Sequence, residues 1–159
     1  MAHVITSVDI DHQKKIYPFS MEEHFPRSLD DYCKTFEIDF FTLRLPCIFC
    51  GFYAGIQDLA SFYSKRLSIV WRSKRPFVCC MKCVRHSAIV EREKYCQCCV
   101  KCADLDAVVG RSLRDIVIRC ISCYGLLDYA EKIDACVSER LVYLIRGHWR
   151  TECRECVEK

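Results

Sequence analysis

Cysteine pairs are the residues of this chain whose types and spacing point most directly to chemistry. The 159 residues include 15 Cys. Two cysteines separated by two residues occur at six places, beginning at Cys47, Cys80, Cys96, Cys99, Cys120 and Cys153. Chance at this cysteine frequency would produce about 1.4 such pairs. Because one tight turn can direct both sulfurs of a pair at a single metal ion, the pattern indicates metal-binding thiolates rather than disulfides.

Four of the pairs form an internal repeat. The two sets are related by an offset of 73 residues, which converts Cys47, Cys50, Cys80 and Cys83 into Cys120, Cys123, Cys153 and Cys156. Within each set, 29 residues separate the two pairs. Four thiolates leave no open position on Zn²⁺, so each set predicts a structural zinc site and the chain should carry two zinc ions. A repeat of about 40 residues buries too little surface to be stable alone, so we expect zinc to contribute to folding.

The remaining seven cysteines lie outside this repeat. Cys96, Cys98, Cys99 and Cys102 form a local cluster that partly imitates an iron–sulfur ligand run, but the position of the fourth ligand holds Asp106. We therefore expect this cluster to lie on a helix, with some thiols packed and others exposed. The last three are predicted to be packing thiols, namely Cys33, Cys79 and Cys136.

The composition excludes several classes of protein. Hydrophobic residues make up 52% and charged residues 28%, as expected for a folded chain. The net charge of +3 is too small to require a general phosphate-binding surface. The sequence holds no apolar run long enough for a membrane span, and residues 1–11 lack the features of a secretory signal. We expect an intracellular protein with no membrane partner.

The elements that position the cysteine pairs can be predicted from periodicity and from turn residues. We expect helices over 29–36, 56–63 and 81–102, strands over 41–45, 67–71, 76–79 and 141–145, and a second-repeat helix that begins after Asp128. The expected organisation is a flexible extension (1–27), a first zinc domain (28–85), a connector helix and link (86–110) and a second zinc domain (111–159). The fold class is α+β: two tandem pseudo-repeated zinc domains, each with short helices and a small antiparallel sheet, joined by a connector helix.

The spacing of the eight repeated cysteines, with 36 residues between the two sets, resembles that of papillomavirus early protein six. Supporting stretches are Ser68–Arg72, Asp115–Cys120 and Ile145–Trp149, and the likeness is closer to the cutaneous-type members. The resemblance implies a protein without enzymatic activity that captures acidic LxxLL helices of host regulators. By resemblance these partners are a Mastermind-like Notch coactivator and a HECT ubiquitin ligase. The resemblance also implies action in the host nucleus and cytoplasm. The expected outcomes are altered host transcription, differentiation and apoptosis.

The resemblance also implies which residues bind the peptide. The apolar pocket would contain Phe49, Leu67, Val70 and Cys79, with Arg119 and His148 at its rim. The chain ends in Lys159, which cannot fill the pocket of a PDZ domain, so no PDZ partner is expected. Ser64 replaces an aromatic residue that the resemblance links to tumour-suppressor docking and to self-association, so self-association is expected to be weak.

Two other classes of function compete with the adaptor. A zinc deaminase would need a His-x-Glu motif beside the Pro46-Cys47-x-x-Cys50 half-signature, and none of the five histidines has Glu two residues later. The alternative that remains is a zinc-dependent nucleic-acid-binding transcription regulator. It rests on one basic cluster, made of Lys65, Arg66, Arg72, Lys74 and Arg75.

Overall fold

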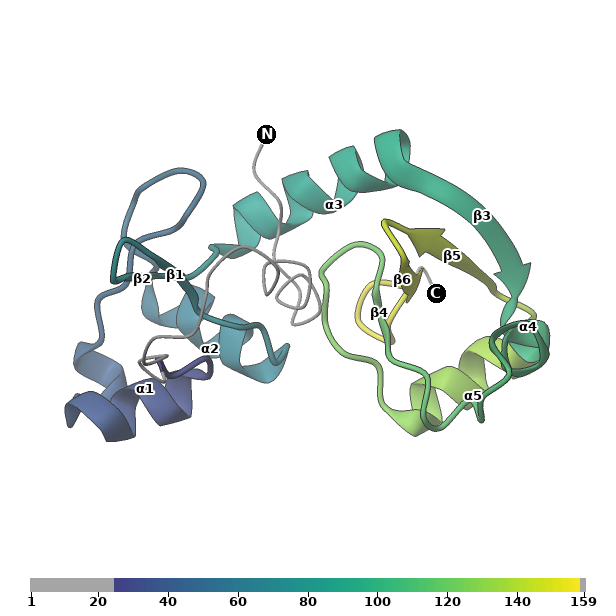
Figure 1. Cartoon of the computed structure of the whole chain (residues 1–159), viewed down its shortest axis with the longest axis horizontal. Helices are drawn as coiled ribbons and strands as arrows, with labels where there is room; N and C mark the ends of the chain where they lie inside the picture. The colour runs from purple at the N-terminus through teal and green to yellow at the C-terminus, as the bar shows by residue number, and fades with distance from the viewer. Residues whose placement is uncertain (1–24, 158–159) are drawn as a thin grey trace, which may run out of the picture. The chain divides into compact units, whose positions relative to one another are not determined.

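The computed structural model of the chain describes residues 25–157 and divides into two compact units, one ending at Cys83 and the other beginning at Val84 (Figure 1). Most of the expected flexible extension lies outside the described residues. Phe25 and Pro26 near its end are packed, because the Trp71 indole donates a hydrogen bond to the Pro26 carbonyl (2.8 Å) and stacks on Phe25. Between residues 25 and 157, no helix has both the length and the apolar character that a bilayer span requires.

The first unit contains short helices and one hairpin. Its elements are α1 (Leu29–Phe36), the 3-10 helix η2 (Phe40–Thr42), α2 (Ile56–Ser64), β1 (Val70–Arg72) and β2 (Arg75–Phe77). Ser28 caps the start of helix α1, because its hydroxyl accepts a hydrogen bond from the Asp31 backbone N–H (3.1 Å). The strand expected over 41–45 is wrong: Asp39 accepts a hydrogen bond from the Phe41 N–H and caps a 3-10 turn there instead.

Helix α3 (Met81–Tyr95) begins in the first unit and continues into the second. The helix predicted over 81–102 is correct as far as Tyr95 and wrong beyond it. Residues Cys96–Lys101 form strand β3, which pairs antiparallel with β5 (Leu141–Ile145) and has a bulge between Cys96 and Cys98. Residues 96–101 form a strand rather than a helix because the edge of β5 can hydrogen-bond with them, and a local sequence pattern contains no information about that partner.

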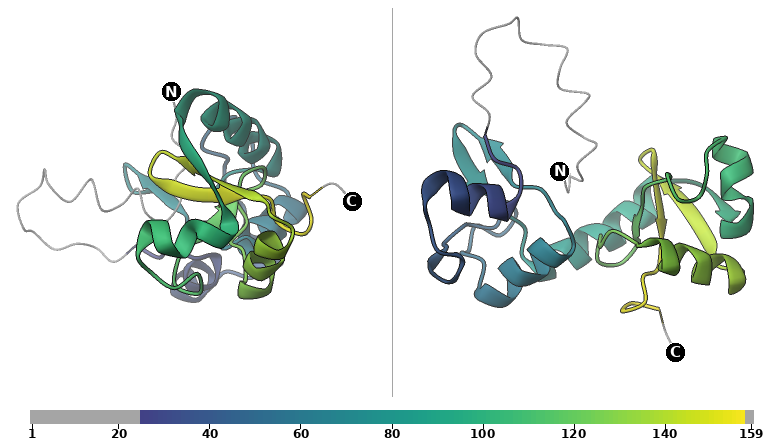
Figure 2. Two further views of the ribbon diagram at one scale, coloured as in Figure 1. Left: turned by 90° about the vertical axis from the view of Figure 1, so that its right-hand side faces the viewer. Right: turned by 90° about the horizontal axis from the view of Figure 1, so that it is seen from below.

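The second unit is built around a four-stranded sheet. It also contains the 3-10 helix η3 (Cys102–Asp104), α4 (Leu105–Val109), β4 (Ile118–Cys120), α5 (Tyr129–Val137) and β6 (His148–Thr151). The strand order is β3-β5-β6-β4, with β4 parallel to β6 and the other neighbours antiparallel. Figure 2 shows this unit, coloured from teal to yellow, from two further sides. The core includes the fully buried residues Leu105, Ile118, Ala135 and Val142.

The two units share one repeated module at the backbone level. Helices α2 and α5 begin and end 73 residues apart, and so do the turns before them that carry the first cysteine pair of each set. Within each module the residue after the first cysteine donates a 2.9 Å backbone hydrogen bond to an equivalent later residue: Ile48 to Val78, just after β2, and Ile121 to Thr151, at the end of β6. The predicted α+β fold with two pseudo-repeated cysteine modules is therefore confirmed.

Candidate metal centres

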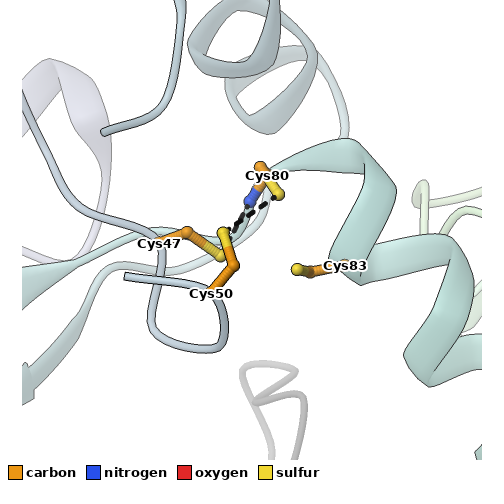
Figure 3. Close-up of side chains that lie close together, drawn as sticks. All are labelled: Cys47, Cys50, Cys80 and Cys83. Carbon is orange, nitrogen blue, oxygen red and sulfur yellow. Dashed lines mark hydrogen bonds between the residues drawn. The ribbon is translucent and has the colours of Figure 1, made fainter. Parts of the chain in front are cut away.

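The first metal centre brings together Cys47, Cys50, Cys80 and Cys83, whose sulfur atoms all lie within 4.8 Å of one another. Cys47 and Cys50 come from the turn before α2, while Cys80 precedes α3 and Cys83 lies in its first turn (Figure 3). The Sγ atoms of Cys50 and Cys80, which are 30 residues apart in the chain, are separated by 3.9 Å. Two distant segments thus place four sulfurs around one point.

The second centre repeats this arrangement with Cys120, Cys123, Cys153 and Cys156, again within 4.8 Å. Here the Sγ atoms of Cys123 and Cys153 are 3.8 Å apart. Zinc–sulfur bonds of about 2.3 Å in a tetrahedron require sulfur–sulfur separations of about 3.8 Å. Both centres therefore fit a tetrahedral zinc ion, and four thiolates leave it no open position for catalysis.

Backbone N–H groups stabilise negative charge on the first sulfur of each set. The N–H of Cys80 donates to Cys47 Sγ and the N–H of Cys153 donates to Cys120 Sγ, both at 3.5 Å. Burial alone would raise the pKa of Cys47, but backbone hydrogen bonds, including those from Cys50 and Cys80, lower it to about 7. The first set thus has one thiolate ligand prepared in advance, whereas in the second set the neighbouring Cys123 and burial raise the pKa of Cys120 despite its backbone hydrogen bonds.

The other ligands need a cation to become thiolates. Burial raises the pKa of Cys80 and Cys83, and the nearby Cys47 sulfur opposes a second negative charge in the case of Cys83. In the other set, burial and the Cys120 charge raise the pKa of Cys156 to about 12. Because four neighbouring thiolates repel one another, the protons leave only when a metal ion replaces them.

The two centres differ in exposure. Cys50 is exposed in the first set, whereas Cys120, Cys123 and Cys153 are all buried and belong to the core of the second unit. The second metal centre is therefore also the centre of the second unit's packing.

The second unit also contains a buried ionic cluster that the sequence did not reveal. Glu91 on α3 is only 7% exposed, and its Oε2 accepts a 2.5 Å hydrogen bond from the Tyr124 hydroxyl. The Arg150 guanidinium lies over the Tyr124 ring, 4.2 Å from its centroid, and 3.9 Å from Glu91. Burial, and then the Glu91 contact, raise the pKa of Tyr124. This cluster holds the later part of α3 against the second metal module.

Lys132 is a second residue that the sequence analysis missed. It occupies the repeat position of Leu59, and both side chains are buried. Its ammonium donates hydrogen bonds to the carbonyl oxygens of Leu113, Arg114 and Ile116 at 3.1, 3.1 and 2.6 Å. The same position is thus an apolar core residue in the first module, whereas in the second module it fixes the backbone of residues 113–116. Only comparing the two repeats position by position could have suggested the change.

The residues predicted to bind a peptide are distributed over both units. Leu67 and Cys79 are buried, while Phe49 and Val70 are half-buried, all in the first unit. His148 is half-buried on β6. Arg119 differs from the expected rim position, because it is 6% exposed and its Nη1 donates to the Tyr124 carbonyl at 2.9 Å.

Leu67 does line a hollow of the surface. This pocket has a volume of about 560 Å³ and lies entirely within the first unit. Its wall also includes Leu29, Tyr63 and Ser64, and it carries charges of both signs, from Arg27, Arg66, Asp30 and Asp31. None of the other predicted peptide contacts in the first unit belongs to the wall of this pocket.

The comparisons with known proteins agree with the geometry. Residues 47–156, from the first ligand to the last, match the family model described as Early Protein (E6). The chain is 50% identical over 137 residues to Protein E6 of human papillomavirus type 48, covering 86% of this chain and 96% of the relative. It is 48% identical over 139 residues to Protein E6 of human papillomavirus 65, covering 87% and 99%. For Protein E6 of human papillomavirus 20, one of the cutaneous-type viruses, the identity is 33% over 136 residues, covering 86% and 82%.

The predicted family is thereby confirmed on both the ligand spacing and the similarity of most of the chain. It is a family of viral regulatory proteins and not a known enzyme family. The chain belongs to the papillomavirus early protein E6 family.

Proposed function

We propose that this protein is a non-enzymatic viral adaptor that holds two structural zinc ions and binds acidic LxxLL helices of host regulators. The host ligands would be a Mastermind-like Notch coactivator or a HECT ubiquitin ligase, met in the nucleus and cytoplasm. Altered host transcription, differentiation and apoptosis would follow. Family membership supports the class of protein, and the pocket at Leu67 is the observation that carries the binding proposal.

The size and the apolar residues of the pocket suit an LxxLL helix. Its volume of about 560 Å³ suits a few leucine side chains, because ligand pockets commonly hold roughly 300–1,000 Å³. Leu29 and Leu67 supply apolar surface. Arg27 and Arg66 place positive charge in the wall, and Asp30 and Asp31 place negative charge there as well, so the apolar residues carry the proposal. Because Arg119 is buried, the proposal does not depend on it.

Leu67→Ala is expected to weaken the binding of an acidic LxxLL peptide by about 10- to 100-fold, as for a buried anchor residue at an interface. Leu67→Glu should abolish binding, because a charge buried without a partner costs several kcal/mol. Both effects can be measured by calorimetric titration of the zinc-loaded protein with a synthetic peptide.

Leu59→Ala is the matched control. Leu59 is also a buried leucine of the first unit, but it does not line the pocket. It should lower stability by about 2–5 kcal/mol while leaving peptide affinity unchanged. Peptide binding by zinc-loaded Leu67→Glu at the strength of the wild type would refute the adaptor site.

The nucleic-acid alternative retains one favourable observation. Of the basic cluster, Arg66, Arg72, Lys74 and Arg75 are exposed, and the last three lie on the β1–β2 hairpin. Such a cluster attracts phosphate groups without reading sequence.

We expect any DNA binding by the chain to be weak, indifferent to sequence and lost at moderate salt. About five phosphate contacts give a slope of about −4.5 in log K against log salt, so affinity should fall about 10²- to 10³-fold between roughly 50 and 200 mM salt. Electrophoretic mobility shifts with Arg72→Glu and Arg75→Glu would measure this, with peptide binding as the control. Sequence-specific binding that survives about 200 mM salt would favour the transcription regulator instead.

A further inference from the structure

Two cysteines outside the metal centres face each other in the second unit. Cys102 opens η3, and Cys136 lies in the last turn of α5. Their Sγ atoms are 3.2 Å apart. A backbone contact beside the thiols joins η3 to the segment just after α5, because the Cys102 N–H donates a 2.9 Å hydrogen bond to the Arg140 carbonyl.

The separation differs from that of the metal ligands. Two sulfurs on one tetrahedral zinc ion lie about 3.8 Å apart, as they do in both four-cysteine centres. Cys102 and Cys136 are closer than that. A disulfide bond of about 2.05 Å requires them to approach by little more than about 1 Å. The pair is therefore suited to bond formation rather than to sharing a zinc ion.

The two thiols differ in accessibility. Cys102 is 1% exposed and Cys136 is half-buried. A reagent in solution reaches Cys136, whereas Cys102 can be reached only by the sulfur beside it. This is the arrangement of an attacking thiol with a resolving thiol behind it.

We propose that Cys102 and Cys136 are a redox-modification site that closes to a reversible intramolecular disulfide by exchange with a low-molecular-mass disulfide such as oxidised glutathione. In the first step the Cys136 thiol loses its proton, and its sulfur attacks one sulfur of oxidised glutathione. The glutathione S–S bond breaks, and one glutathione leaves as a thiolate that takes up the proton.

In the second step the Cys102 sulfur attacks Cys136 Sγ and expels the second glutathione, which takes the Cys102 proton. The protein pair loses two electrons and two protons, and oxidised glutathione gains them as two thiols. Burial and the neighbouring Cys136 raise the pKa of Cys102 to about 12, while Arg140 and Lys132 oppose this shift. The closing step should therefore be slow at neutral pH. Its rate should rise about tenfold for each unit of pH increase, as long as the pH stays below the pKa of Cys102.

Closure would tie η3 to α5 without using a zinc ligand. The bond would close a loop of more than about 30 residues, from Cys102 to Cys136, around the core of the second unit. A constraint of this length should raise the midpoint of thermal unfolding of the zinc-loaded chain by on the order of 10 °C.

The test uses the full-length, zinc-loaded chain in which the exposed thiols Cys96, Cys98 and Cys99 are replaced by Ser. The half-buried Cys33 is replaced by Ser as well, so that it cannot react. This parent is incubated with oxidised glutathione and analysed by intact mass, peptide mapping and zinc content. We expect a loss of about two mass units, one peptide pair joined through Cys102 and Cys136, and two retained zinc ions.

Two further variants separate the roles of the thiols. Adding Cys102→Ser should trap glutathione on Cys136, whereas adding Cys136→Ser should leave Cys102 unmodified because it is buried. A glutathione adduct that persists on Cys136 in the parent, or a disulfide that joins either residue to a zinc ligand, would overturn the proposal. If the buried Ser of Cys102→Ser impairs folding, peptide mapping of the parent still shows whether Cys102 and Cys136 are joined. The trapping experiment is then repeated with Cys102→Ala.

Discussion

Replacing Cys123 by Ser is expected to release one of two zinc ions and to unfold the second unit. Cys123 is 3% exposed and lies in the core that the second metal centre shares with the sheet. Zinc binding contributes about 10–16 kcal/mol in small modules, more than a unit of this size gains from burial alone. Metal analysis of the purified protein, with far-ultraviolet circular dichroism, should show one zinc per chain and loss of part of the ordered structure.

Cys99→Ser is the matched control, because Cys99 is an exposed thiol on β3 of the same unit. It should leave two zinc ions and an unchanged spectrum. Cys50→Ser should remove the other zinc ion and leave the second unit folded. The assignment fails if the wild type carries iron, if it carries a single zinc, or if Cys99→Ser loses metal while Cys123→Ser retains it.

Glu91→Ala is expected to lower the free energy of unfolding of the zinc-loaded protein by about 3–5 kcal/mol, the usual cost of removing one partner of a buried charge pair. Glu91 is 7% exposed and accepts the hydrogen bond of the buried Tyr124 hydroxyl. Its removal leaves that hydroxyl without its carboxylate acceptor and leaves Arg150, which is 2% exposed, without a carboxylate 3.9 Å away. Denaturant unfolding monitored by tyrosine and tryptophan fluorescence measures the change.

Glu93→Ala is the control, since Glu93 is exposed on the same helix and should change stability by no more than about 0.5 kcal/mol. Tyr124→Phe removes the hydroxyl and leaves the carboxylate, and we expect a smaller loss of about 1–3 kcal/mol. Equal stability of Glu91→Ala and Glu93→Ala would show that the cluster contributes nothing to holding α3.

Much of the metal chemistry could be predicted from the sequence because it depends on local geometry. A two-residue spacing within one turn presents two sulfurs together, whatever surrounds the turn. The same holds for the helix starts: Ser28 caps α1, and Asp128 and Glu131 form a capping box at α5. The offset of 73 residues also predicted that α2 and α5 would be equivalent.

Long-range contacts decided the rest. The helix predicted to reach residue 102 ends at Tyr95, because β5 lies where it can pair with Cys96–Lys101. The expected rim residue Arg119 is buried, because the Tyr124 carbonyl, five residues away around the metal turn, accepts its hydrogen bond. No local pattern contains these partners.

The spacing of the cysteines was enough to predict the family, the two modules and the eight clustered thiols, since each metal-binding turn is specified within a few residues. The burial of charged residues, the strand formed by the cysteine cluster and the meeting of two thiols required the folded chain. Glu91 and Tyr124 lie 33 residues apart in the chain, and Cys102 and Cys136 lie 34 apart. Their contacts arise when sheet and helices pack around the second metal centre, and burial then makes each of those contacts strong.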